Sequence, residues 1–327
     1  MGCAPHVILF LDISIFEVKS MSEEFSRPPC VSDDVYVAPL AKPAGLADDW
    51  VEPAQAEFDD ADHGIWRDLF ARQSAIAPGR ACDAHGEGLA VLRIDGDCIP
   101  ELDAVNARLR TVSGWELVPV PMLIPDHIFL YHLANRRFPV GNFIRTRAQF
   151  DYVEEPDVFH DMYGHVPLLA DQIFADYMQA FGQAGWKALR FNRLWALSTL
   201  YWFTVEFGLI GREEGDLRAY GAGILSSPQE LKFSLSGRSP NRVHLALERV
   251  MRTDYHISDL QQTYFVIESF DQLYRHTQGR EFADVYESLP PGPIYANSAL
   301  LETDRTYHRG TQEYRLRGGR LSGAAPV

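Results

Sequence analysis

Apolar side chains recur every three or four residues from about Asp62 onward, which is the spacing of helices with one buried face. The pattern predicts a helix that begins near Asp62 and a second that opens at Pro100 and ends at Gly114. A third helix is predicted after Asp171, which has the side chain of an N-cap, and a longer apolar run predicts a buried helix over residues 194–210. The side chains expected to face the core from the first three helices are Ile65, Trp66, Leu69, Phe70, Leu102, Val105, Leu109, Val112, Ile173, Phe174, Tyr177, Met178 and Phe181.

Two short stretches have the composition of strands. They are ELVPVPM, which starts at Glu116, and TYFVIES, which starts at Thr263, and a helix is predicted to resume at Asp271. The chain has no internal repeat and no low-complexity tract. The sequence therefore predicts a mainly α fold with small β elements, in which a single domain spans residues 62–290.

Both ends of the chain differ from this body in composition. Residues 1–61 are predicted to form an acidic, partly disordered arm, because most of this stretch is rich in carboxylates and prolines. Its apolar run from Val7 to Val18 is too short to span a bilayer and has no basic flank. We interpret residues 1–20 either as a stretch read from an upstream start codon, with Met21 as the natural start, or as a disordered leader. Residues 291–327 are interpreted as a polar, glycine-rich tail.

The composition argues against several classes of protein. The net charge is −15, and no basic patch with interleaved aromatic residues is present, which argues against a nucleic-acid partner. No stretch has the length and composition of a membrane span. The four cysteines show neither zinc-finger nor C-x-x-C spacing, which favours free thiols in a reducing cytosol. We therefore expect a cytoplasmic protein that binds no nucleic acid and no membrane.

The stretch EPDVFHDMYGHVPLLADQIF contains the most informative pair of side chains in the chain. His160 and His165 lie five residues apart, and Pro167 stiffens the chain that follows them. Further along, Glu206 lies in LYWFTVEFGLI among residues that are almost all apolar or aromatic. A buried carboxylate is costly unless it is paired or binds a metal. Two imidazoles and one such carboxylate are the ligand set of non-haem Fe(II) oxygen chemistry, so the sequence suggests an iron enzyme.

Spacing alone does not establish such a site, because His127 and His132 show the same interval. Residues five apart differ by about 140° around an ideal helix, so we interpret His127 and His132 as a packing or surface pair. For His160 and His165, the hypothesis is that Gly164 ends a helix and turns the backbone, which returns His165 toward His160. Local reasoning leaves metal ligation and packing equally open. A zinc-protease motif is excluded, since it needs an interval of four and a glutamate beside the first histidine.

Three blocks in order, EEPDVFHDMYGHVPLLAD, YWFTVEFGLI and AYGAGILSS, resemble the catalytic domain of the pterin-dependent aromatic amino acid hydroxylases. The resemblance begins near Trp66, includes IPELDAVNARLRTVSGWELVPVP, and continues to about Phe270. Within the family the chain is most similar to the short bacterial phenylalanine 4-hydroxylases, in which an aspartate, here Asp161, follows the first histidine.

The resemblance implies roles for individual residues. His160, His165 and Glu206 are the implied iron ligands. Arg145 is implied to bind the substrate carboxylate with its planar fork, and Asp157 to orient Arg145. The other implied positions are Phe129 and Asp161 at the pterin, Pro156, Trp202, Phe207 and Ile257 around the substrate ring, and Ser226, which would support a ligating histidine.

For the whole chain, the resemblance implies a phenylalanine 4-monooxygenase. It would hydroxylate L-phenylalanine to L-tyrosine with dioxygen, Fe(2+) and tetrahydrobiopterin or a related tetrahydropterin. The alternatives are a tryptophan hydroxylase of the same family, a metal-dependent hydrolase that uses the same ligands, and a binding protein without activity. No regulatory domain and no tetramer-forming helix is recognised, so a monomer is expected.

Overall fold

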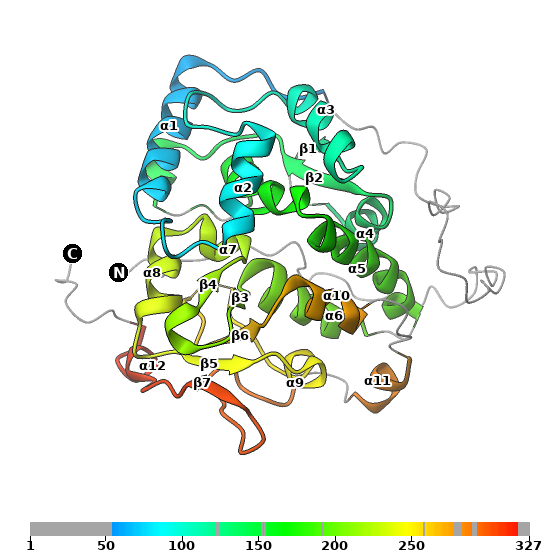
Figure 1. Ribbon diagram of the computed structural model, residues 1–327, viewed down its shortest axis with the longest axis vertical. Coiled ribbons are helices and arrows are strands. Elements are labelled where there is room, and N and C mark those ends of the chain that lie inside the picture. The colour runs from blue at the N-terminus through cyan, green and yellow to red at the C-terminus, as the bar shows by residue number, and fades with distance from the viewer. Residues whose placement is uncertain are drawn as a thin grey trace.

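The computed structural model describes residues 54–319, with gaps at 122–123, 152, 154, 191–192, 258, 278–282 and 290–292. The expected leader and nearly all of the acidic arm lie outside the described residues. Figure 1 shows the arrangement of the elements.

Helices make up most of the described chain, and short strands account for the rest of its regular structure. The α-helices are α1 (Asp60–Ser74), α2 (Asp83–Leu92), α3 (Leu102–Val112), α4 (Asp126–Ala134), α5 (Gln172–Arg190), α6 (Leu194–Tyr201), α7 (Ala222–Leu225), α8 (Pro228–Ser236), α9 (Leu247–Met251), α10 (Phe270–Thr277), α11 (Ala283–Ser288) and α12 (Glu313–Leu316). The strands are β1 (Glu116–Val120), β2 (Arg137–Gly141), β3 (Leu209–Ile210), β4 (Arg218–Ala219), β5 (Asn241–His244), β6 (Thr263–Ile267) and β7 (Thr306–His308). The mainly α fold with small β elements is therefore confirmed. Among the described helices, none has the length and apolar character needed to cross a bilayer.

The strands form two separate sheets. Five of them pair in the order β4-β3-β6-β5-β7, with β6 parallel to both of its neighbours and the two outer strands antiparallel. β1 and β2 form a parallel pair elsewhere in the fold. α5 packs against α4, which precedes β2, and against α10, which follows β6, so it runs between the two sheets (Figure 1).

The N-cap predicted for α5 is present. The Asp171 carboxylate accepts hydrogen bonds from the backbone N–H groups of Ile173 (3.0 Å) and Phe174 (2.9 Å), which satisfies two donors of the first turn. Ile173 and Val112 were expected in the core, but both are exposed. Each lies in a terminal turn of its helix, and at a helix end a residue in register with the apolar face can extend past the edge of the core.

Two predicted boundaries were wrong. α3 begins at Leu102 after an N-cap at Glu101, so Pro100 precedes the helix instead of opening it. The apolar run over residues 194–210 is not one helix, because α6 ends at Tyr201 and the chain passes through a π-helical turn into β3. A continuous apolar run has no period that separates a buried helix from a buried strand, so the sequence pattern could not show this change.

Part of the expected C-terminal tail belongs to the folded body. β7 pairs with β5 at the edge of the larger sheet. In α12, the ring of Tyr314 is buried and lies 5.3 Å from that of Phe233, centroid to centroid. β7 thus covers the sheet edge that β5 would otherwise expose, and α12 packs against α8.

Candidate metal centre

Residues His160–His165 form a single π-helical turn, in which backbone hydrogen bonds join residues five apart. Such a widened turn brings side chains five residues apart toward the same side, whereas an α-helix separates them by about 140°. The hypothesis that Gly164 ends a helix was wrong. Gly164 lies inside the turn without a positive φ, and a 3-10 helix over Val166–Ala170 continues directly from it.

Gly164 has a different role, which is to let α7 come close. A Cβ atom at this position would lie 2.9 Å from the Cβ of Ala222, the first residue of α7. This distance is shorter than carbon atoms tolerate. The glycine therefore allows the π-helical turn and α7 to pack together, and the residue that follows α7 is Ser226.

Glu206 ends a second π-helical turn, Trp202–Glu206, which continues α6. Its side chain is buried. Single π-helical turns are rare and are found frequently at functional sites. All three candidate ligands of this chain come from two such turns.

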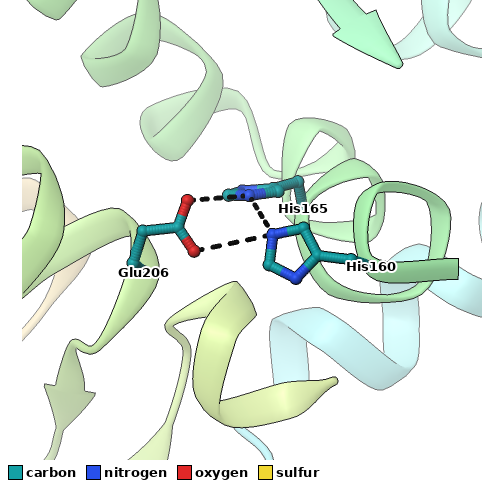
Figure 2. A group of neighbouring side chains, drawn as sticks. All are labelled: His160, His165 and Glu206. Atoms are coloured by element: carbon teal, nitrogen blue, oxygen red, sulfur yellow. Dashed lines mark hydrogen bonds and ion pairs between the residues drawn. The ribbon is translucent and has the colours of Figure 1, made fainter. Parts of the chain in front are cut away.

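His160, His165 and Glu206 converge on one point (Figure 2). The Nε2 atoms of the two histidines are 3.1 Å apart, His165 Nε2 is 3.1 Å from Glu206 Oε1, and His160 Nε2 is 3.6 Å from Oε2. Ligand atoms at right angles and about 2.1 Å from one ion lie about 3.0 Å apart, so the three fit one face of a coordination sphere. Within the described residues they form the group of three that could hold a metal, and His127 and His132 are not part of it.

Ser226 determines which nitrogen of His160 faces this point. The Ser226 hydroxyl donates to the backbone carbonyl of Ala222 (2.8 Å), so its oxygen is available to accept from His160 Nδ1 (2.9 Å). With the proton on Nδ1, the lone pair of His160 is on Nε2, the atom that points at His165 and Glu206. The contact therefore favours the tautomer of His160 that a metal ligand needs.

The charges of the three side chains suit a cation. Burial lowers the pKa of His160 to about 4, so the imidazole is neutral near pH 7. Burial by itself would raise the pKa of Glu206, but His165 and His160 hold it below its ordinary value and the carboxylate stays ionised. Its Oε2 has no hydrogen-bond partner within the described residues. A buried anion with an unsatisfied oxygen beside imidazole lone pairs is the donor set of a divalent cation such as Fe(II).

Asp161 lies next to this group and is fully buried. One of its oxygens accepts from the backbone N–H of Gly141 at 2.7 Å, and the other has no partner within the described residues. Burial raises the pKa of Asp161 to about 7. A divalent cation nearby would lower this pKa again, because it favours the ionised carboxylate.

Arg145 and Asp157 form a buried, two-pronged ion pair. Arg145 Nε and Nη2 donate to the two oxygens of Asp157 at 2.7 and 2.8 Å, and the backbone N–H of Arg145 adds a third bond. The backbone N–H of His160 donates to the same carboxylate at 3.0 Å. Burial alone would raise the pKa of Asp157, but Arg145 holds it below its ordinary value. One carboxylate thus joins the guanidinium to the first histidine of the metal group.

The aromatic residues after α6 form a cluster of rings. The centroid of the Trp202 ring lies 4.6 Å from that of Phe207 and 4.8 Å from that of Tyr255, which stacks on it. Pro156 is buried next to Asp157. Sequence reasoning missed Tyr255, because nothing in the local pattern shows that its loop folds back onto the π-helical turn after α6.

Two residues expected at the site are placed differently from one another. The Phe129 ring is buried on α4 against Phe138 and Tyr201, whose rings lie 5.1 and 6.3 Å from that of His165. Phe129 thus contacts two rings that in turn lie beside His165, one of the three candidate metal ligands. Because Phe129 is buried, a pterin could stack on its ring only after a neighbouring side chain moved away from it. Ile257 is 38% exposed on the loop beyond Tyr255, so its side chain is not an enclosed wall of the ring cluster.

Gly164→Ala is expected to destabilise the protein by ~1–3 kcal/mol, because the added methyl group overpacks the contact with α7. Chemical denaturation with and without iron measures this loss, and iron affinity should fall with it. Gly86→Ala is the matched control, since its Cβ would meet nothing within 4 Å on the exposed side of α2. That change should stabilise the protein by roughly 0.5–1 kcal/mol. Equal stability of the two variants would contradict the role given to Gly164.

Comparison with known proteins finds one family over most of the chain. A family model described as biopterin-dependent aromatic amino acid hydroxylase matches residues 4–288. A phenylalanine-4-hydroxylase of Caulobacter vibrioides is 47% identical over 284 residues, which is 86% of this chain and 96% of the relative. A phenylalanine-4-hydroxylase of Ralstonia nicotianae is 48% identical over 256 residues, 78% of this chain and 81% of the relative.

Solved structures show the same fold. Phenylalanine hydroxylase from Chromobacterium violaceum bound to cobalt has a TM-score of 0.76 and 45% identity, with 80% of this chain and 95% of that chain covered. The structure of the same enzyme with iron and phenylalanine bound has a TM-score of 0.72 and 45% identity, with 76% and 90% covered.

Proposed function

The chain belongs to the biopterin-dependent aromatic amino acid hydroxylase family, and we propose that it is a phenylalanine 4-monooxygenase. Its reaction is the hydroxylation of L-phenylalanine to L-tyrosine with dioxygen and a tetrahydropterin. The observation that carries the proposal is the convergence of His160, His165 and Glu206 on one point, with the buried Arg145 joined to it through Asp157. Relatives named for this activity support the choice of substrate.

The metal ligands we propose are His160, His165 and Glu206. Bound Fe(II) and tetrahydrobiopterin supply the activation of dioxygen, chemistry that no side chain provides. Ser226 holds the proton of His160 on Nδ1, and Glu206 brings the negative charge that offsets the cation. A metal held by these three residues would keep coordination positions open for substrates.

The substrate carboxylate is proposed to bind to Arg145. Asp157 engages Nε and Nη2, so the plane of the guanidinium is fixed before substrate arrives. Pro156, Trp202 and Phe207 are proposed to surround the substrate ring. For the pterin we propose Asp161 as a polar neighbour and Phe129 as a stacking partner that the bound cofactor uncovers.

Oxygen uptake by Fe(II)-loaded enzyme with a tetrahydropterin tests the proposal. Phenylalanine should exceed tyrosine by ~10- to 100-fold in kcat/KM, because an apolar pocket leaves the para hydroxyl of tyrosine unpaired. Tryptophan should be a poorer substrate still, since its larger ring system needs room beside Trp202 and Phe207. Ile257 is exposed and does not support this order of substrates, which depends on the aromatic residues Trp202 and Phe207. Equal turnover of tyrosine and phenylalanine would overturn the substrate assignment, and a hydrolase would consume no dioxygen.

We also propose a cytoplasmic, monomeric protein whose catalytic domain spans residues 62–290 and is completed by residues 306–316, which pack against it. The net charge of −15 supports a monomer through repulsion between copies. Within the described residues, Cys82 and Cys98 are free thiols, as expected in a reducing compartment. Cell fractionation and light scattering test the two statements, and a stable tetramer would contradict the second.

A further inference from the structure

The indole of Trp202 is held by a directional contact as well as by stacking. Its Nε1–H donates to the side-chain oxygen of Gln261 at 3.0 Å, and both side chains are buried. Stacked rings can slide and turn against each other at little cost, whereas a hydrogen bond weakens steeply with angle. The bond to Gln261 is therefore the contact that defines the plane of the indole where it packs against Phe207 and Tyr255.

Gln261 has no freedom to rotate. Its side-chain Nε2 donates to the backbone carbonyls of His256 (2.9 Å) and Asp259 (3.1 Å). With both amide hydrogens bound to carbonyls, Oε1 must face the indole, so the orientation of the amide follows from its partners. The Gln261 side chain thus links Trp202 to the loop that contains Tyr255.

The backbone of Gln261 is held from a second direction. Its N–H donates to Oε1 of Glu230 at 3.2 Å, and the hydroxyl of Tyr264 donates to the same oxygen. Glu230 is fully buried on α8, whose N-cap, Ser227, directly follows Ser226. α8 therefore begins next to Ser226, which contacts His160, and its Glu230 also holds Gln261, which contacts Trp202.

We propose that Gln261, anchored by Glu230, is a positioning residue that sets the plane of the Trp202 indole and thereby the shape of the pocket that selects the aromatic substrate. This inference rests on the function proposed above, because it takes Trp202 as a wall of the substrate pocket. Gln261 touches neither substrate nor metal in this role and acts through Trp202. Without its acceptor, the buried indole N–H is left unsatisfied, and the ring turns toward another partner.

Gln261→Leu and Gln262→Leu form a matched pair of variants. Gln262 is the next residue and is also buried, but its Nε2 donates to the carbonyl of Leu260 and no bond joins it to Trp202 or Glu230. Gln261→Leu is expected to raise both KM and the calorimetric Kd for phenylalanine by ~10-fold, with kcat within about 3-fold. Its preference for phenylalanine over tryptophan should fall by at least ~5-fold, while Gln262→Leu stays within about 2-fold of wild type in every quantity.

A double-mutant cycle with Trp202→Phe separates positioning from loss of structure. Phenylalanine has no N–H to orient, so Gln261→Leu should change substrate preference by less than about 2-fold in that background. Glu230→Leu should shift preference in the same direction as Gln261→Leu, and Glu230→Gln should restore it, because the amide oxygen still accepts both hydrogen bonds. This second pair keeps the inference testable should Gln261→Leu fail to fold.

The outcomes distinguish the inference from the proposed function. An active wild type in which the Gln261 and Gln262 variants behave alike overturns the positioning role alone. An undiminished Gln261→Leu effect in the Trp202→Phe background does the same. A wild type that neither binds nor hydroxylates phenylalanine overturns the proposed function and the inference with it.

Discussion

His160→Ala, His165→Ala and Glu206→Ala are each expected to lose tightly bound iron and to lose hydroxylation by more than ~100-fold. Removing a residue that only supports a metal ligand commonly costs 10- to 100-fold in affinity or activity, so removing a ligand itself must cost more. Each substitution leaves only two of the three ligand residues, whose ligand atoms lie as close as 3.1 Å to one another in the intact site. Two donors cannot complete one face of a coordination sphere. Iron content by elemental analysis and product formation by chromatography measure the two losses.

The control for this experiment is His127→Ala. His127 is exposed and belongs to no group of described residues that could hold a metal, so iron and activity should be unchanged. His132→Ala is likewise expected to keep iron, but His132 is buried in α4, so the variant should lose stability. Stoichiometric, tightly held iron in the His165→Ala protein would contradict the proposed site.

Arg145→Lys is expected to raise KM for phenylalanine by ~10-fold or more, which corresponds to at least ~1.4 kcal/mol of lost binding. Lysine keeps the charge but has no planar fork, so it cannot engage Asp157 through two parallel bonds and present a fixed donor to the substrate at the same time. KM for the pterin should change far less. Steady-state kinetics in which each substrate is varied separately measures the two effects.

Arg147→Lys is the matched control, because Arg147 lies two residues further on in an exposed ion pair with Asp68. Such pairs contribute little, so both KM values should remain within about 2-fold of wild type. Equal increases of both KM values in Arg145→Lys would mean that Arg145 supports the structure and does not bind the substrate carboxylate.

The amphipathic helices could be predicted from the sequence because their signals are local. The buried face of α5 and its Asp171 cap depend on residues within a few positions of each other, and apart from the exposed Ile173 both are as expected. The strands β1 and β6 were predicted for the same reason. The errors lie at ends of elements, in the C-terminal segment that contains β7 and α12, and in the run over residues 194–210. In that run, packing against distant chain segments decides between helix, π-helical turn and strand.

The candidate site shows the same difference between features that are local in the sequence and features that depend on the fold. Sequence alone determined which residue types stand at His160, His165 and Glu206, and the resemblance of their surroundings to one family identified the chemistry. Only the tertiary structure decided that a π-helical turn brings the histidines together, because a regular helix with the same sequence would separate them. It also decided which distant residues support them, since Gln261 reaches Trp202 across 59 positions and Ser226 reaches His160 across 66. A hydrogen bond between residues so far apart depends on the fold of everything between them, and no local pattern encodes it.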